Sequence, residues 1–283
     1  MDSILKISSH SFHRLSIVQD EKRYLVLKQF SGDTTRALKC IQKQKTFQPL
    51  LAEGLHISAA EVIRIEQKLD ELELFMPYIH GINAAGFALY GTKAVAYELQ
   101  TTLNQLIITE MANSKIQQIP GYVFVNKIEE ILNKLNSGIL KSCIIQILDY
   151  IGQERDKFLE IPIGSCHGDL TLSNILLIRK KGIFLIDFLD SPIESPLQDV
   201  AKLIQDFIFG WSFRYEKNGL QLKGQILSEV AMPSIVQMLL IQYKKQLSWF
   251  ILLTLARIAP YVQDEITHNW LINALKTALR RFT

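Results

Sequence analysis

The 283-residue sequence is poor in the features that mark several common classes of protein. Its three cysteines are scattered, with no C-x-x-C pair, which argues against a zinc or disulfide framework and favours reduced thiols. A net charge of +3 is too small to indicate a dedicated nucleic-acid surface. The first residues lack the basic flank and apolar run of a signal peptide, and the apolar run at residues 249–256 is too short to cross a bilayer. We therefore expect a cytoplasmic protein without membrane insertion or a nucleic-acid partner, and nothing indicates its oligomeric state.

The most informative part of the chain is a short segment that contains two acidic residues and one amide. Asn174 follows Asp169 by five residues, and Asp187 comes thirteen residues later. Apolar runs at residues 175–178 and 183–186 lie between them and predict a strand, a turn and a second strand. Phosphoryl transfer from ATP needs one carboxylate to orient the acceptor hydroxyl, and a second carboxylate plus an amide to hold Mg2+.

This segment resembles the catalytic motif of the aminoglycoside phosphotransferase and choline kinase family. It reads CHGDLTLSN at residues 166–174 and IDF at residues 186–188. The family form is H-G-D-L-x-x-x-N, in which glycine stands where protein kinases have arginine. The resemblance implies that Asp169 is the catalytic base, that Asn174 and Asp187 are metal ligands, and that His167 is a buried brace of the loop.

The order of the predicted elements agrees with the protein-kinase-like fold of that family. Strands are predicted at residues 14–18, 24–28, 61–65 and 72–76, and helices at residues 34–52, 94–108, 126–135, 139–158 and from 198 to 281. We therefore expect an α+β, bilobal fold. A small strand-rich, nucleotide-binding N-lobe would span residues 1–79, and a larger helical C-lobe with the catalytic loop, metal site and acceptor-binding helices would span residues 80–283.

The resemblance also implies where ATP binds. Lys28, at the end of an apolar strand, would contact the phosphates, and Met76, Pro77 and Ile79 would form the hinge that binds adenine. The family pattern puts a flexible turn between the first two strands. Here that place is held by residues 8–13, which lack glycine, and Ser11 is retained as a candidate phosphate contact.

The helix after Lys28 should offer a glutamate to position this lysine, yet no glutamate occurs between residues 29 and 52. Two partners remain open. Gln44 would be a neutral hydrogen-bond partner, and Glu53 would reach the lysine from the end of the helix.

The short link after Asp187 favours a small acceptor over a protein, because it has no A-P-E motif and no room for a peptide-docking segment. Asp199 would then be structural, capping a helix or bracing the loop. Asp190 and Glu194 with nearby aromatics would suit a cationic amino alcohol, whereas Trp211 and Arg214 would suit a sugar or an acidic metabolite. A buried helix face is the commoner explanation of such aromatics.

We therefore expect an ATP- and Mg2+-dependent kinase that phosphorylates a hydroxyl of a small metabolite. Amino alcohols of the choline or ethanolamine type and sugars are ranked equally as acceptors, ahead of aminoglycosides, because an acidic lining for a polycation is not evident. The alternative is a catalytically inactive nucleotide-binding regulatory module of the same fold. The missing glycines and the missing helix glutamate favour this alternative, while the intact Asp169, Asn174 and Asp187 count against it.

Overall fold

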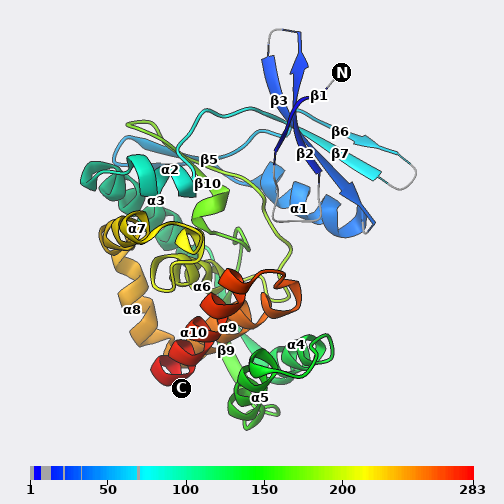
Figure 1. Ribbon diagram of the computed structural model, residues 1–283, viewed down its shortest axis with the longest axis vertical. Helices are drawn as coiled ribbons and strands as arrows, with labels where there is room; N and C mark the ends of the chain where they lie inside the picture. The colour runs from blue at the N-terminus through cyan, green and yellow to red at the C-terminus, as the bar shows by residue number, and fades with distance from the viewer. Residues whose placement is uncertain (1–2, 8–13, 22, 33, 69–70) are drawn as a thin grey trace.

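The computed structural model describes residues 3–7, 14–21, 23–32, 34–68 and 71–283. An antiparallel five-stranded sheet lies at the N-terminal end, with the helix α1 (Thr34–Thr46) packed against it (Figure 1). In spatial order its strands are β1 (Ser3–Ile7), β2 (Arg14–Asp20), β3 (Arg23–Ser31), β7 (Glu71–Pro77) and β6 (Arg64–Gln67). The helix buries Ala37, Cys40, Ile41 and Gln44, which share one face at helical spacing.

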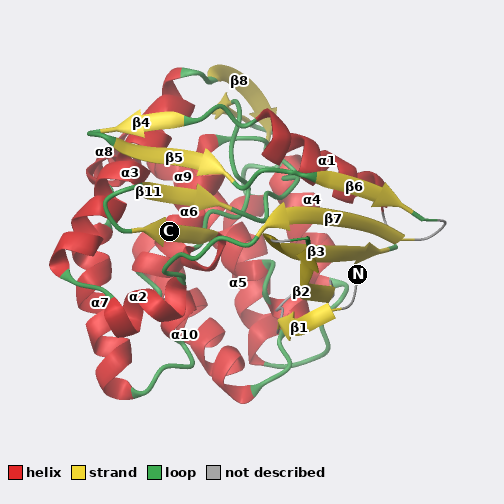
Figure 2. Ribbon diagram, turned by 90° about the horizontal axis from the view of Figure 1, so that it is seen from above, coloured by secondary structure: helices red, strands yellow, loops and turns green. Residues whose placement is uncertain are grey.

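A second, four-stranded sheet brings residues from both halves of the chain together (Figure 2). Its order is β10 (Ile175–Ile178), β11 (Gly182–Leu185), β5 (Leu55–Ala59) and β4 (Leu50–Ala52). β5 runs parallel to β11, and Gly182 is required there because a Cβ at this position would lie 1.9 Å from the His56 carbonyl oxygen. The sheet therefore joins residues 50–59 directly to the predicted catalytic hairpin.

Helices make up most of the rest of the molecule, which confirms the predicted α+β class. They are α2 (Ala84–Tyr90), α3 (Lys93–Ala112), α4 (Tyr122–Leu132), α5 (Ile139–Gly152), α6 (Pro196–Phe207), α7 (Asn218–Ala231), α8 (Ser234–Gln242), α9 (Lys244–Ala256) and α10 (Glu265–Phe282). A two-stranded sheet, β8 (Lys115–Pro120) with β9 (Phe158–Ile163), lies among them. The second half of α9 is buried on all sides, as its apolar run predicts, and it packs against α6 and α10.

No single helix in the described ranges is long and apolar enough to cross a membrane. The bent pair α7 and α8, which meet at 73°, passes that test only when the two are taken together and only by length and composition.

Several predicted boundaries are wrong, and each error has a local cause. The helix predicted to reach residue 52 ends at Thr46, because Pro49 follows closely and residues 50–52 pair with β5. The helix predicted over residues 139–158 ends at Gly152, since residues from Phe158 onwards pair with β8. The strand expected at residues 61–65 is shifted to Arg64–Gln67.

Candidate active site

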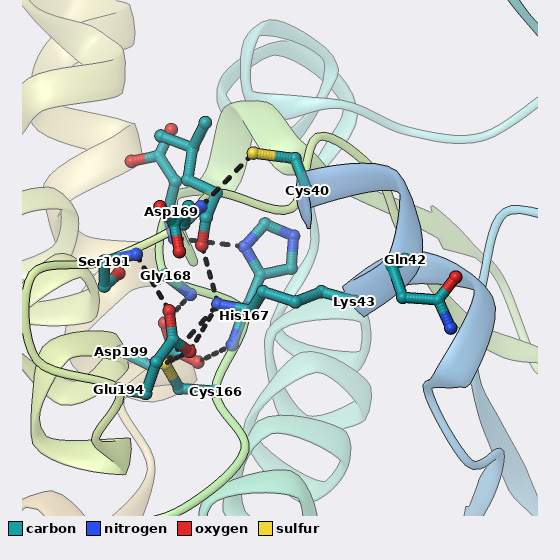
Figure 3. Close-up of polar contacts among 12 residues, drawn as sticks. Cys40, Gln42, Lys43, Cys166, His167, Gly168, Asp169, Ser191, Glu194 and Asp199 are labelled. Carbon is teal, nitrogen blue, oxygen red and sulfur yellow. Dashed lines mark hydrogen bonds and ion pairs between the residues drawn. The ribbon is translucent and has the colours of Figure 1, made fainter. Parts of the chain in front are cut away.

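The predicted catalytic loop is held from below by Asp199, in the first turn of α6 (Figure 3). This carboxylate is fully buried and accepts hydrogen bonds from the backbone N–H groups of His167 and Gly168, the latter at 2.7 Å. Burial raises the pKa of Asp199 to about 7, although the two backbone donors oppose that rise. Asp199 therefore braces the loop, which is one of the two structural roles that the sequence predicted.

His167 connects the loop to the strand end that precedes Asp187. Its ring is 1% exposed, its Nε2 lies 2.8 Å from the Ile186 carbonyl oxygen, and its Nδ1 accepts from the backbone N–H of Asp169 at 3.2 Å. One nitrogen must donate and the other must accept, so the imidazole is neutral with its proton on Nε2. Burial lowers its pKa to about 4, in agreement with the neutral form. This side chain is a buried brace, as the resemblance implied.

Gly168 lies against the segment that follows Asp187, and only glycine fits there. Its φ is +86°, and a Cβ would lie 2.3 Å from the Leu189 carbonyl oxygen. The backbone N–H of Leu189 also donates to the His167 carbonyl oxygen at 3.0 Å. The two halves of the predicted motif, twenty residues apart in sequence, are therefore one packed unit.

The carboxylate of Asp169 has two partners at short distance. Asn174 Nδ2 lies 2.9 Å from Asp169 Oδ2, and Lys202 Nζ of α6 lies 2.9 Å from Asp169 Oδ1. Burial is the largest single effect and would raise the pKa of Asp169, but the charge and hydrogen bond of Lys202, with smaller contributions from His167 and Arg257, together hold the pKa below its usual value. Asp169 is therefore ionised at neutral pH.

Asp187 is brought next to this group by one backbone hydrogen bond. The Ile186 N–H donates to the Asn174 carbonyl oxygen at 3.0 Å, so Asn174 and Asp187 lie at adjoining strand ends. Asp187 has a φ of +60°, a conformation that costs a non-glycine residue energy and often occurs at functional sites. Its Oδ1 accepts from Lys28 Nζ at 2.7 Å.

Lys28, on β3, is 6% exposed, and its ion pair with Asp187 corrects the sequence-based choice of partner. The amide of Gln44 donates to the Ala60 carbonyl oxygen at 2.7 Å and to the sulfur of Met76 instead of bonding Lys28. Glu53 lies in the turn between β4 and β5, so it does not end a helix that could carry it to the lysine. Both of the predicted alternatives are wrong.

Lys43, a lysine on α1 that sequence reasoning missed, connects this helix to the catalytic loop (Figure 3). Lys43 Nζ donates to the Leu189 carbonyl oxygen at 2.6 Å and to Glu194 Oε2 at 2.7 Å. Glu194 also accepts from the Ser191 backbone N–H at 2.8 Å. Because Glu194 is engaged inside the protein, it is not available to hold a cationic acceptor, as the sequence suggested. No pattern along the chain could have paired two residues 151 positions apart.

The predicted hinge residues lie at the end of β7. Met76 is 5% exposed and Pro77 is the last residue of the strand. The Tyr78 N–H donates to the Tyr24 carbonyl oxygen at 3.0 Å, so by alternation along an antiparallel pair the carbonyl of Pro77 points away from β3. Ile79 follows in the loop and packs on the apolar cluster beneath the sheet. Ser11 lies outside the described residues.

Asp206, also missed, joins the loop to the aromatic segment after α6. Its buried carboxylate accepts from the N–H groups of Leu172 and Ser212 at 2.5 and 2.8 Å. Trp211, next to Ser212, stacks on the guanidinium of Arg214 at 3.5 Å. Phe207 and Phe213 are core residues, as the commoner explanation predicted.

Comparison with known proteins places these features in a wider group. The model of the Phosphotransferase enzyme family matches residues 4–231. No curated protein sequence matches the chain. Many solved structures are similar to it, and three of them, all at low identity, serve as examples. They are a thermostable mutant of aminoglycoside phosphotransferase APH(4)-Ia (13% identity, 99% of this chain and 94% of that chain, TM-score 0.64), a ternary complex of that enzyme with ADP and hygromycin B (13%, 98% and 92%, 0.62) and a GDP complex of aminoglycoside 2'-phosphotransferase-IIIa (12%, 98% and 91%, 0.57). These likenesses confirm the predicted protein-kinase-like fold.

Proposed function

The chain belongs to the Phosphotransferase enzyme family, and we propose that it is an ATP- and Mg2+-dependent kinase that phosphorylates a hydroxyl of a small molecule. One observation carries this proposal. Asn174 contacts Asp169 at 2.9 Å, its backbone is bonded to the residue before Asp187, and Asp187 contacts Lys28 at 2.7 Å. A base, two oxygen ligands and a phosphate-binding lysine are the groups that phosphoryl transfer requires.

Asp169 would orient the acceptor hydroxyl and take its proton. Its low pKa makes it a weak base, which suits a loose transition state in which the proton leaves late and positioning matters most. Lys202 and Asn174 hold the carboxylate from two sides, so its direction is fixed before an acceptor binds.

The residues present fit a magnesium ion. The amide nitrogen of Asn174 donates to two oxygens of Asp169, so the amide oxygen of Asn174 is directed away from Asp169. Asp187 supplies a carboxylate at the adjoining strand end. One or two protein oxygens completed by phosphates and water are typical of Mg2+. When bound, Mg2+ would neutralise the charge of the phosphates. Lys28 would exchange Asp187 for a phosphate oxygen.

Adenine would bind at the end of β7. The carbonyl of Pro77 is directed away from β3 and would accept from the adenine amine, while Ile79 would supply the backbone donor. Met76 would contribute its backbone to the same edge. We place the division between the nucleotide-binding lobe and the acceptor-binding lobe at residue 79, directly after this strand.

The test is ADP release from Mg-ATP with a panel of amino alcohols, sugars and aminoglycosides, with the Asp169→Asn variant in parallel. We expect acceptor-dependent ADP formation that falls at least about 100-fold in the variant, because a positioned base contributes a factor of this size. Binding of Mg-ATP should persist in both proteins. Binding without turnover across the panel would favour the inactive regulatory module, and equal turnover in the variant would remove Asp169 from its role.

A further inference from the structure

Positive charge lies beside the carboxylate of Asp169. Lys202 lies three residues after Asp199 on α6, so the helix face that braces the loop also presents this lysine to the base. Its Nζ lies 2.9 Å from Asp169 Oδ1 and 3.3 Å from Gln205 Oε1, and its side chain is 12% exposed. The ammonium group is therefore held in place beside the carboxylate.

Arg257, the residue directly after α9, adds a second cation whose charge acts on the same carboxylate. Its guanidinium is half-buried, and its charge interacts with the carboxylate of Asp169 and with the charge of Arg36 on α1. Within the described ranges it makes no side-chain hydrogen bond or ion pair. Burial lowers its pKa, as expected for a cation without a close acidic partner of its own. Its N–H donors are thus available to a ligand.

Two basic side chains from two separate elements, Lys202 and Arg257, therefore act on one carboxylate. Asp169 can balance one of these charges, while the nearby Glu194 is occupied by Lys43. Such an excess of positive charge is costly in a folded protein unless a ligand supplies negative charge.

We propose that the acceptor carries a carboxylate or a phosphate next to the hydroxyl that is phosphorylated, and that Lys202 and Arg257 bind this anionic group. The proposal rests on the kinase function proposed above. A hydroxyl within about 3 Å of Asp169 Oδ1 lies within about 6 Å of Lys202 Nζ, because that nitrogen is 2.9 Å from the same oxygen. At this separation an anionic substituent is attracted and a cationic one is repelled. Acidic sugars therefore fit the site better than amino alcohols or aminoglycosides.

The experiment compares matched acceptors that differ in charge. Rates with Mg-ATP are measured for D-glucuronate, glucose 6-phosphate and D-glucose, for D-glycerate and glycerol, and for choline. The proteins are the wild type, Lys202→Met, Arg257→Gln and, as a control, Lys244→Met, which changes an exposed lysine at the start of α9. We expect kcat/KM to favour an anionic member over its neutral partner by at least about tenfold, and both site variants to remove most of that ratio.

Other outcomes overturn the proposal. An equal loss of kcat for every acceptor in Lys202→Met, with the charge preference retained, would show that this lysine contacts the transferred phosphoryl group instead. If no compound is phosphorylated, calorimetric titration of the same compounds in the presence of Mg2+ and a non-hydrolysable ATP analogue decides. Equal binding of anionic and neutral partners, or binding of neither, rejects the anionic acceptor. The glucuronate and glucose 6-phosphate arms distinguish a carboxylate from a phosphate.

Failure of this inference is distinguishable from failure of the kinase function. Mg-ATP binding is measured without any acceptor, and its absence in the wild type would remove the kinase proposal itself. Normal ATP binding with a preference for neutral or cationic acceptors would leave the kinase proposal standing and reject only the anionic acceptor. The Lys244→Met control should match the wild type in every arm, since Lys244 lies on the surface.

Discussion

The buried neutral His167 makes the stability of this protein depend on pH in a calculable way. Its pKa is about 4 in the folded protein, against an ordinary value of 6.5. The unfolded chain therefore binds a proton below pH 6.5 that the folded protein does not bind until about pH 4. The contribution of His167 to stability is fully present above pH 6.5 and is lost as the pH falls toward 4.

The size of this loss follows from the two values. One pKa unit corresponds to about 1.4 kcal/mol, so the complete change amounts to about 3 kcal/mol. At pH 5 the unfolded histidine is almost fully protonated and the folded one is almost neutral, and about 2 kcal/mol of that change has been reached. A change of this size is a large part of the stability of an ordinary domain.

Urea unfolding at pH 8 and pH 5 measures this effect. The unfolding free energy of the wild type should fall by about 2 kcal/mol more than that of His167→Gln, because the glutamine cannot take up the proton. His56→Gln, which changes an exposed histidine on β5, is the control and should follow the wild type. If His167→Gln loses as much stability as the wild type between the two pH values, the assignment of a neutral, buried imidazole to His167 is wrong.

Two further substitutions test the packing of the loop. Gly168→Ala should lower the unfolding free energy by at least about 2 kcal/mol in chemical denaturation, because its Cβ would lie 2.3 Å from a carbonyl oxygen; an unchanged midpoint would contradict the close approach. Lys43→Met should cost about 2 kcal/mol, because its partner Glu194 would keep its charge in a partly buried place, with side chains 20% and 35% exposed. Calorimetry of Lys43→Met with Glu194→Gln added should show part of that loss restored, and a fully additive pair would argue against the contact.

Local patterns in the sequence were sufficient for elements whose hydrogen bonds are formed between neighbours. The hairpin of β2 and β3, the hairpin of β10 and β11 and the long helix α3 all appear where the predictions placed them. The pairing of β5 with β11 and the pairing of β8 with β9 were not predicted, because the two strands of each pair lie far apart along the chain. Such pairings depend on the folded topology and leave little trace in a short window of sequence.

The same division applies to the candidate site. Asp169, Asn174 and Asp187 fall within one segment, and the sequence could present them together. Their supports could not be predicted in this way, because Lys202 comes from α6 and Arg257 from the end of α9. The partner of Lys28 was wrong for a related reason: the expected glutamate is missing, and the ion pair is formed with Asp187 across 159 residues. Site residues that share one segment of sequence can be predicted together, whereas those that the fold brings in from other elements cannot.

The tight packing of Gly168 has a consequence for how such a protein can evolve control. Protein kinases have arginine at this place, and phosphorylated activation loops are ordered through arginine–phosphate pairs. Here the position is closed by the Leu189 carbonyl oxygen and by a backbone conformation that disfavours side chains. No single mutation at residue 168 can introduce an arginine without displacing the loop that it would serve. The catalytic loop of this chain is packed in place without such a pair, and we expect its output to follow the concentrations of nucleotide and acceptor and not a covalent mark.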